Sequence, residues 1–341
     1  MRNKRGIIAL VAVLIIGIFG ISYFSKFSSN NVSEEGYFHI PTGASYAQII
    51  DSISPYLKNK ESFESVAKSM NLDKVNHPGR YKVVKGKSNK ELVNMLKQGL
   101  QVDVSLRIGD FSDVYQMMGR VAKRTETDSL TYINAFDKIA KNKGLSNAED
   151  LKKYFFIDTY NFFWTVKPEE FFNRFEEEYN RFWTQERIEK EKATGLTRNQ
   201  VYALASIVYQ ESGGKPDEQK TIAGLYMNRY KKGMKLQSDP TVIYAVNQAT
   251  GFKEQIKRVR YKHLREPSPY NTYANVGIPP GPISIVDKNA VDAVLNYENN
   301  NYIFMAADPN RPGLHKFTAS DVEHAENAKV YQQWLDKQNI Q

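Results

Sequence analysis

The chain of 341 residues contains no cysteine and only five histidines. Without cysteine, neither disulfide bonds nor thiolate ligands can stabilise the fold or build a site, and the redox compartment is unconstrained. The histidines never fall at the His-x-x-His or comparable spacing of a ligand pair, so we expect no metal. No cofactor-binding motif is present either, and we expect no cofactor. The five residues are His39, His77, His263, His315 and His324.

A stripe of positive charge is also missing, although the formal net charge is +9. The lysines and arginines are spread over the chain without a nucleic-acid-binding motif, so we expect no nucleic-acid partner. A negatively charged cell wall or membrane surface would suit this charge, and ordinary solubility explains it equally well. The length of the chain favours two domains with appendages over a single core.

One long apolar run is present, from Ile7 to Phe24, and it contains no charged residue. About 18 residues span roughly 27 Å as a helix, close to the hydrocarbon thickness of a bilayer. Arg2, Lys4 and Arg5 precede the run, which predicts a cytoplasmic N-terminus and an exported remainder. We therefore expect residues 1–24 to form a cytoplasmic tip and a single-pass anchor in the cytoplasmic (inner) membrane. A cleaved signal peptide is the alternative.

A polar linker, residues 25–36, separates this run from an internal repeat within residues 37–108. Each copy of the repeat has the pattern of a strand, a glycine turn, a serine N-cap and an amphipathic helix. We therefore expect a small α+β module here. The glycine, the serine and the predicted helix are Gly43, Ser45 and 46–57 in the first copy, and Gly86, Ser88 and 89–100 in the second.

Residues 109–341 are predicted to form a second domain. A third, weaker copy of the pattern begins it, with Ser112 as the N-cap, and residues 112–192 are mainly helical in pattern. After Pro168, aromatic residues recur at helical spacing, which is more typical of a core than of a binding platform. From 236 to 285 the chain is rich in loops, and such segments carry binding residues when a rigid scaffold holds them. The aromatic residues are Phe171, Phe172, Phe175, Tyr179 and Phe182.

A further helix is predicted after Thr197. This residue and Gln200 are spaced as a capping box, Thr-x-x-Gln, which places the first helical residue near Arg198. Gly213 and Gly214 supply the stop signal, because glycine readily adopts the left-handed conformation that ends helices.

Glu211 ends one apolar face of this helix, at the i, i+3, i+4, i+7 spacing it shares with Leu204, Ile207 and Val208. A carboxylate there would be partly desolvated and would lie at the negative end of the helix dipole. Both effects disfavour the ionised form, so the pKa of Glu211 should rise, as a general acid requires near neutral pH. The alternative is a glutamate that turns out to solvent at a frayed helix end.

Four segments of the C-terminal half carry further polar and aromatic residues. They are 205–211, 236–241, 270–273 with 277–283, and 315–317 with Glu323 and His324. In this order, and with the apolar run, the repeat and Asp158-Thr-Tyr160, they resemble the MltG-type (YceG-like) endolytic murein transglycosylases over nearly the whole chain. The catalytic helix of that family has the pattern Leu-Ala-Ser-Ile-(Ile/Val)-Glu-x-Glu. Tyr209 occupies its first acidic position here, so the resemblance assigns catalysis to Glu211 alone.

The resemblance implies an α+β fold with an N-terminal transmembrane helix, a LysM-like α+β module over 37–108 and a YceG-like catalytic domain over 109–341. It also implies a lytic transglycosylase that cleaves the MurNAc-GlcNAc bond inside nascent peptidoglycan strands. Such an enzyme leaves 1,6-anhydro-MurNAc ends and limits strand elongation. The implied partners are peptidoglycan glycan strands, the membrane and the cell-wall synthases.

This chemistry needs one carboxylate where an ordinary glycosidase needs two. The C6 hydroxyl of the sugar is the nucleophile, so one residue can protonate the glycosidic oxygen and then accept the hydroxyl proton. Intramolecular attack gains a large effective molarity, which makes a second carboxylate dispensable. Other residues must orient the sugar, and each candidate could instead bond within its own loop. The candidates are Gln237, Ser238, Asp239, Tyr270, Asn271 and Thr272.

Asp239 is the residue on which a different chemistry would depend. Placed across a cleft from Glu211, it would allow a two-carboxylate glycan hydrolase. Its Asp-Pro context favours a turn in which the aspartate bonds its own backbone, so we predict a structural or orienting role. A non-catalytic peptidoglycan-binding scaffold is a second alternative. A third, a lyase for a soluble metabolite such as aminodeoxychorismate, is disfavoured by the exported domain.

Overall fold

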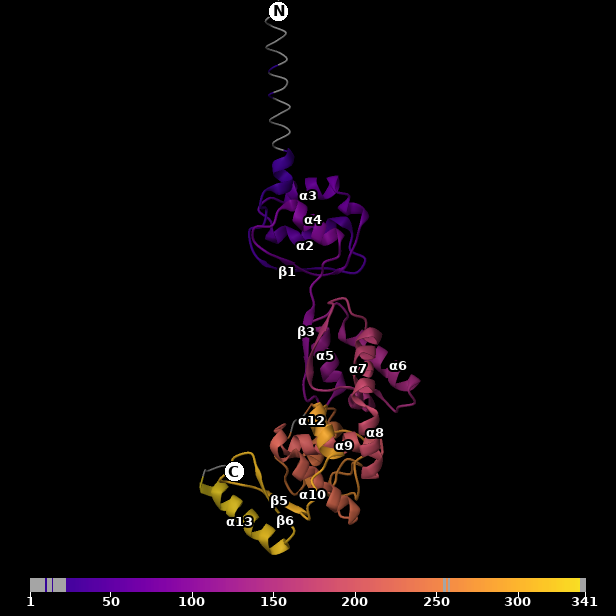
Figure 1. The fold of residues 1–341 in the computed structure, drawn as a ribbon, viewed down its shortest axis with the longest axis vertical. Coiled ribbons are helices and arrows are strands. Elements are labelled where there is room, and N and C mark those ends of the chain that lie inside the picture. Colours follow the sequence, from indigo (N-terminus) through magenta and orange to yellow (C-terminus); the bar gives the residue numbers. More distant parts are fainter. Residues whose placement is uncertain (1–9, 11–13, 15–22, 254–255, 257, 338–341) are drawn as a thin grey trace, which may run out of the picture. The chain divides into compact units, whose positions relative to one another are not determined.

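The computed structural model describes residues 10, 14, 23–253, 256 and 258–337. They form two compact units (Figure 1). The first runs up to Leu106 and includes Ala122–Asp128 and Asn161–Lys167, and the second comprises the rest of the chain. The predicted anchor, residues 1–24, lies almost entirely outside the described residues. Within them, no helix combines the length and the apolar character needed to span a bilayer.

The first unit contains a small antiparallel sheet covered by short helices. Strand β1 (Gly36–Ile40) pairs with β2 (Gly79–Val83), and Phe38 lies opposite Tyr81 in the register. Both side chains are buried, so the sheet contributes directly to the core of the unit. The helical segments are α2 (Tyr46–Ile53), η1 (Ser54–Tyr56), α3 (Lys60–Ser69), η2 (Leu72–Lys74) and α4 (Asn89–Lys97).

The predicted repeat is confirmed. Ser45 and Ser88 cap α2 and α4, and each forms a reciprocal capping box with the residue three positions later. Gly43 and Gly86 precede them with φ of 79° and 87°, a conformation that favours glycine. Both helices are shorter than predicted. In the first copy the chain passes into the 3₁₀ segment η1, because Pro55 lies two residues after the end of α2 and cannot continue the helix.

The next elements along the chain hold an aromatic core, and the division between the two units runs through three of them. Strands β3 (Val104–Ile108) and β4 (Asp158–Phe162) form another two-stranded sheet. The predicted aromatic stripe lies on α7 and is buried, which confirms its role in the core. Asp113, rather than the predicted Ser112, accepts the N–H groups at the start of α5. The helical segments are α5 (Val114–Ala122), α6 (Ser129–Asn142), η3 (Ala148–Tyr154), α7 (Pro168–Phe182) and α8 (Gln185–Thr194).

Three mutually packed helices form the scaffold of the candidate site: α9 (Arg198–Glu211), α10 (Gln219–Lys231), which follows η4 (Pro216–Glu218), and α12 (Lys288–Leu295) (Figure 1). The capping box of Thr197 and Gln200 opens α9 as predicted. Residues 201–208 are all buried, so α9 is enclosed on every side and not on the single face that the sequence predicted. A helix apolar all round is held by packing in the interior rather than at a surface.

A helix that the sequence pattern did not indicate, α11 (Asp239–Ala249), lies within the segment predicted to be rich in loops. Ser238 is its N-cap and Pro240 lies in its first turn. The Asp-Pro pair was therefore wrongly predicted to be a turn. Proline is favoured in the first turn of a helix because the N–H it lacks has no helical partner there. A single-turn element, η5 (His263–Arg265), follows.

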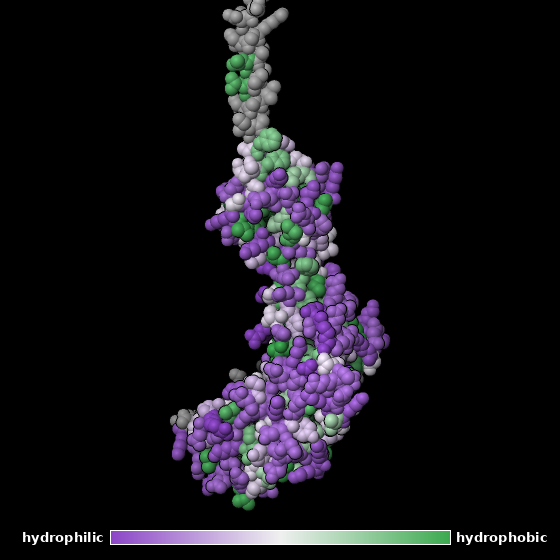
Figure 2. All heavy atoms as spheres, viewed as in Figure 1, coloured by the Kyte–Doolittle hydropathy of each residue, from purple (hydrophilic) through white to green (hydrophobic). Residues whose placement is uncertain are grey.

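The C-terminal part of the second unit is a hairpin with a helix beside it. Strands β5 (Phe304–Ala307) and β6 (His315–Thr318) are antiparallel, and α13 (Asp321–Lys337) packs along them (Figure 1). The face of this unit seen in Figure 2 is mainly hydrophilic, with scattered apolar side chains. Together the helices and small sheets confirm the predicted α+β class.

A buried lysine ties η3 to α11. Only 1% of Lys152 is exposed, and its Nζ donates to the Ser112 carbonyl at 2.9 Å and to the Tyr244 hydroxyl at 2.7 Å. The carboxylate of Glu149 lies 2.9 Å away. Burial lowers the pKa of Lys152 and raises that of Glu149, and their attraction opposes both shifts. The cluster therefore holds the helix that carries Ser238 against the aromatic core.

Replacing Lys152 with alanine should destabilise the second unit by about 3–5 kcal/mol, because Glu149 would be left without its counter-charge. Urea unfolding followed by circular dichroism measures the change. Lys138→Ala, on the exposed face of α6, is the matched control. A double variant, Lys152→Met with Glu149→Leu, should recover much of the loss. Equal stability of Lys152→Ala and Lys138→Ala would contradict this account of the cluster.

Candidate active site

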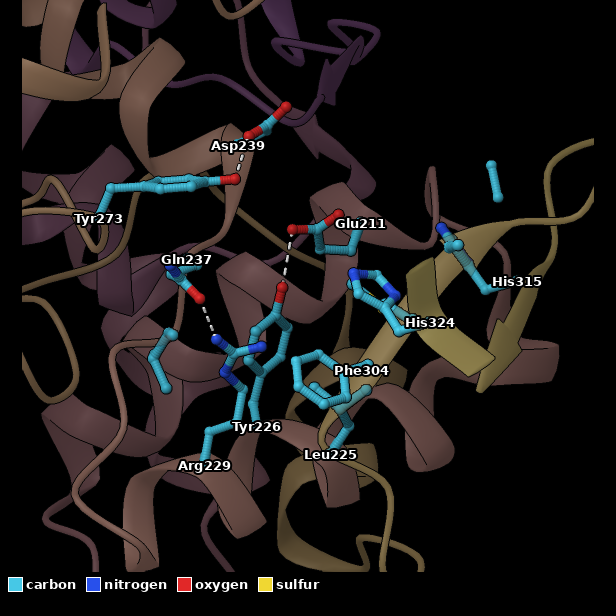
Figure 3. Close-up of a pocket in the computed structure, with 14 residues that line it drawn as sticks. Glu211, Leu225, Tyr226, Arg229, Gln237, Asp239, Tyr273, Phe304, His315 and His324 are labelled. Atoms are coloured by element: carbon cyan, nitrogen blue, oxygen red, sulfur yellow. Dashed lines mark hydrogen bonds between the residues drawn. The ribbon is translucent and has the colours of Figure 1, made fainter. Parts of the chain in front are cut away.

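Glu211 is the last residue of α9, and the backbone after it turns sharply. Gly213 and Gly214 have φ of 57° and 74°, so the predicted stop signal is confirmed. The turn leaves the Glu211 side chain in the wall of a cavity of about 430 Å³. Helix α10, the segment before α11, strand β5 and His315 supply other parts of the wall (Figure 3).

Two hydroxyl groups hold the Glu211 carboxyl, and both act on the same oxygen. Oε1 accepts from the Tyr226 hydroxyl at 2.8 Å and from the Ser238 hydroxyl at 2.5 Å. In the described part of the chain, no hydrogen bond reaches Oε2. The carboxyl is thus fixed between α10 and the start of α11, and it does not turn out from a frayed helix end.

The environment raises the pKa of Glu211, as predicted. Burial is the largest cause, since it disfavours the charged form, and the negative charge of Asp239 acts in the same direction. The hydrogen bonds from Ser238 and Tyr226 and the charge of His315 oppose the rise. The group is therefore biased toward its protonated form while its ionised form retains specific partners.

Ser238 is placed by its backbone as well as by its side chain. Although it is the N-cap of α11, its hydroxyl makes no capping hydrogen bond and bonds Glu211 instead. Its N–H donates to Thr272 Oγ1 at 3.0 Å, and Thr272 Oγ1 lies 2.8 Å from Thr241 Oγ1. Thr272 is 2% exposed and acts from behind the cavity. A buried threonine pair thus fixes the serine that contacts the carboxyl.

Gln237 lies in the cavity wall next to Arg229. Its φ of 52° is left-handed, an uncommon conformation for a residue other than glycine. Arg229 Nη2 donates to the Gln237 side-chain oxygen, while its Nε and Nη1 donate to the carbonyls of Lys235 and Ile303, each at 2.9 Å. One buried guanidinium therefore connects α10, the segment before α11 and the residue preceding β5 (Figure 3).

Asp239 lines the same cavity as Glu211, but its partner differs from the prediction. Its Oδ1 accepts from the Tyr273 hydroxyl at 2.7 Å (Figure 3). In the described structure it makes no hydrogen bond to its own backbone, so that expectation was wrong. The reason is its position as the first residue of α11, where the backbone is already helical.

The other predicted contacts do not reach the cavity. The Asn271 side chain is fully buried and donates to the carbonyls of Leu264 and Glu266 at 3.0 and 2.9 Å. Tyr270 packs against Tyr244, with ring centroids 4.7 Å apart. The structure thus brings Gln237, Ser238 and Asp239 to Glu211, while Tyr270, Asn271 and Thr272 support the loop behind them. Direct contact of Gln237, Ser238 and Asp239 with a substrate stays a prediction.

Several lining residues had no role in the sequence prediction. Tyr226 and Arg229 lie one turn apart on α10, and Phe304 opens β5. An arginine and a tyrosine within a buried helix are a usable signal, because polar groups in a core need partners. His315 lies in one of the four C-terminal segments described above, but no catalytic or binding role was predicted for it. Its ring Nδ1 and backbone N–H both bond the Glu218 carboxylate, at 2.9 Å and 2.9–3.0 Å.

Within the described residues, no group of three or more His, Asp or Glu side chains is placed to bind a metal ion. The polar groups that line the cavity are instead two carboxyls, two phenol hydroxyls, a guanidinium, an amide and two imidazoles. This arrangement suits proton transfer to a polar ligand held by hydrogen bonds.

A solved structure has a similar fold. A crystal structure of a yceG-like protein from Listeria monocytogenes aligns with a TM-score of 0.57 and 24% sequence identity, covering 86% of this chain and 98% of that one. At this identity the likeness concerns the fold alone.

Curated relatives match shorter segments. An endolytic murein transglycosylase of Bacillus subtilis (strain 168) is 36% identical over 140 residues, which are 41% of this chain and 36% of the relative. A protein of the same name from Streptococcus pneumoniae (strain D39) is 32% identical over 120 residues, 34% of this chain and 21% of the relative. The matches thus span about a third or less of the length of these relatives.

A family model matches most of the chain. The model of the YceG-like family matches residues 38–330, which include most of both compact units and every residue of the candidate site. This match covers well over half of the sequence. The chain therefore belongs to the YceG-like family.

Proposed function

We propose that this protein is an endolytic lytic transglycosylase that cleaves the MurNAc-GlcNAc bond within nascent peptidoglycan strands and leaves 1,6-anhydro-MurNAc ends. The observation that carries the proposal is the half-buried carboxyl of Glu211, held on one oxygen by Tyr226 and Ser238 in a polar cavity. The names of the matched relatives support the same substrate class. Cleavage within strands would limit their elongation.

The two hydrogen bonds determine which carboxyl oxygen carries the proton. Because Tyr226 and Ser238 both donate to Oε1, that oxygen acts as the acceptor and the proton resides on Oε2. Oε2 has no hydrogen-bond partner among the described residues and is the atom available to a ligand. Protonated Glu211 is thus oriented as a general acid before substrate arrives.

In the proposed reaction, Glu211 Oε2 transfers its proton to the glycosidic oxygen as the bond from that oxygen to C1 of the muramyl residue breaks. The C6 hydroxyl of the same residue then attacks C1 and forms the new C1–O6 bond. Its proton moves to Glu211, which is again protonated. No water is consumed, and the intramolecular attack gains a large effective molarity.

The same environment serves both halves of this cycle. Burial keeps Glu211 protonated at the start, while Tyr226 and Ser238 stabilise the carboxylate that exists after proton transfer. Hydrogen bonds to a charged group are stronger than those to a neutral one, so the two donors act mainly when charge has developed. This difference between the two states is what accelerates a reaction.

A two-carboxylate hydrolase is the second candidate, because Asp239 lines the same cavity as Glu211. In a hydrolase Asp239 would activate water or attack C1 itself. Its hydrogen bond from Tyr273 leaves it accessible to the cavity, which keeps this chemistry available. The end groups of the products distinguish the two reactions, since a hydrolase leaves reducing muramic acid ends.

We also propose that the protein is anchored in the cytoplasmic membrane, with both units exported and with cell-wall synthases as partners. The apolar run from Ile7 to Phe24 and the basic residues before it support the anchor. For the first unit we propose a LysM-like module. Two helices between paired antiparallel strands, in the order β1, α2, α3, β2, support that proposal.

The substitution Glu211→Gln should preserve the fold and glycan binding while lowering the formation of anhydro ends by at least about 10²-fold, because glutamine cannot supply a proton. Mass spectrometry of uncrosslinked glycan strands digested by the full-length protein measures the products. Asp217→Asn, an exposed change in the same unit, is the control. Wild-type turnover by Glu211→Gln would exclude the proposed acid, and reducing ends from the wild type would favour the hydrolase.

Removing one donor to Glu211 should change the pH profile. Ser238 lowers the pKa of Glu211, so Ser238→Ala should raise it further. The general acid must be protonated, and activity falls as pH rises through its pKa. The alkaline limb of the kcat profile should therefore move to higher pH, with a lower maximal rate. Ser146→Ala, in an exposed loop, should leave the profile in place. If the alkaline limb of Ser238→Ala lies at the same pH as in the wild type, Ser238 does not affect the pKa of the general acid.

The proposed topology predicts protection from one side of the membrane. Protease added to intact spheroplasts should degrade the units that follow the anchor, because they lie outside. Protease added to inverted vesicles, whose cytoplasmic face is outermost, should leave these units intact. Immunodetection of a C-terminal tag measures both, and a cytoplasmic protein serves as the control. Digestion of the C-terminus from the cytoplasmic side would reverse the topology.

A further inference from the structure

Glu211 separates two cavities of the second unit. The first is the polar cavity described above, and the second, of about 320 Å³, lies beyond the carboxyl. Glu211, Ala307 and His315 line both. The carboxyl therefore stands where two adjoining hollows meet, and a ligand that extended from one into the other would pass over the acid.

The second cavity has an aromatic wall on α13. Tyr331 and Trp334 are three positions apart and so share one face of the helix. Their rings are nearly parallel, with an interplanar angle of 14° and centroids 5.9 Å apart. Both side chains are only partly exposed, and no residue of α13 is buried. The pair therefore offers a flat apolar surface that the core does not use.

The opposite wall is the connection between β5 and β6. It contributes Pro309, Pro312 and Leu314, which are apolar and conformationally restricted. A turn fixes this segment, since the Asp308 N–H donates to the Leu314 carbonyl and the Leu314 N–H donates to the Arg311 carbonyl. This wall of the cavity is thus mainly apolar, and backbone hydrogen bonds hold it in place.

One cation without an ion-pair partner among the described residues lines this cavity. Asp308 is already paired with Arg311 at 2.8 Å, and the Glu211 carboxyl is biased toward its neutral form. Lys215 lines the cavity, is exposed, and has no ion-pair partner among the described residues. A ligand with a flat apolar face and a nearby anionic substituent fits such a cavity.

We propose that Tyr331 and Trp334 form a sugar-stacking subsite that holds the glycan strand on the side of Glu211 opposite the polar cavity. A pyranose ring presents C–H groups on one face, and these pack on the negative face of an aromatic ring. The carboxylates of the stem peptides are the anionic groups that Lys215 would meet. This inference rests on the proposed function, because cleavage inside a strand requires sugars on both sides of the bond.

Binding measured without turnover tests the subsite. In the Glu211→Gln background of the full-length protein, uncrosslinked glycan strands with their stem peptides are titrated at equilibrium. Trp334→Ala should weaken binding roughly tenfold, while Trp334→Phe, which keeps a flat ring, should retain most of it. Gln333→Ala, on the exposed part of the same helix, is the matched control. Unchanged affinity in Trp334→Ala, or equal loss in Trp334→Phe, overturns the proposal.

Kinetics separate this subsite from the catalytic proposal. In the active protein, Trp334→Ala should raise KM for long strands about as much as it raises Kd and leave kcat nearly unchanged. If Glu211→Gln loses turnover but Trp334→Ala keeps the wild-type KM, only the subsite is overturned. If Glu211→Gln keeps full turnover, the proposed function fails, and the binding titration still decides the subsite.

Fluorescence provides a readout that needs no folded alanine variant. Of the three tryptophans, Trp164 lies in the first unit, Trp183 is 6% exposed, and Trp334 lines the cavity. Adding glycan strands to the Glu211→Gln protein should change its tryptophan emission, and Trp334→Phe should abolish most of that change. An emission change of the same size in Trp334→Phe would place the glycan away from α13 and overturn the proposal.

Discussion

The hydrogen bond from Ser238 to Glu211 is the interaction on which the site depends. It joins the C-terminal end of one buried helix, α9, to the N-terminal end of another, α11. The hydroxyl that would ordinarily cap α11 is directed to the carboxyl instead. Tyr226 adds a second donor from α10, so three helices converge on one oxygen atom. The position of the acid is therefore a property of the whole helical packing.

Further hydrogen bonds hold the residues around Glu211 in place. The buried threonines Thr241 and Thr272 hold the backbone of Ser238. Arg229 donates to the side chain of Gln237 and to two backbone carbonyls nearby. Farther back, Lys152 fastens α11 through Tyr244 to the aromatic core. Polar networks of this kind are stabilising only when every member is bonded. The functional oxygen of Glu211, in contrast, has no such partner in the described structure, which distinguishes it from the groups around it.

The local pattern of the sequence was enough to predict the elements with strong start and stop signals. The capping boxes at Ser45, Ser88 and Thr197 and the glycines after Glu211 all lie where their chemistry predicted. These signals act within a few residues of chain, and packing does not override them. The rise in the pKa of Glu211 was also predicted, from its place at the end of an apolar helix face, where desolvation disfavours the charged form.

What could not be predicted depends on contacts distant in sequence. Asp239 and Pro240 favoured a turn locally, yet they begin α11, and the partner of Asp239 is a tyrosine 34 positions away. The loop residues Asn271 and Thr272 have the same hydrogen-bonding groups as Gln237 and Ser238, so composition alone could not distinguish support from lining. Tyr226 and Arg229 are polar groups in a buried helix and so need partners, but the pattern of α10 does not say which ones. Those partners are Glu211, which lies in α9, and Gln237, which lies before α11.

The aromatic pair of the second cavity lies far along the sequence from Glu211. Glu211 and its two donors lie between residues 211 and 238, whereas β5, β6 and α13 occupy only the stretch from Phe304 to Lys337. The aromatic pair on α13 thus comes from a later stretch of the chain than Glu211 and its two donors. Substitutions of Tyr331 and Trp334 can change the affinity for glycan while Tyr226 and Ser238 keep their hydrogen bonds to Glu211.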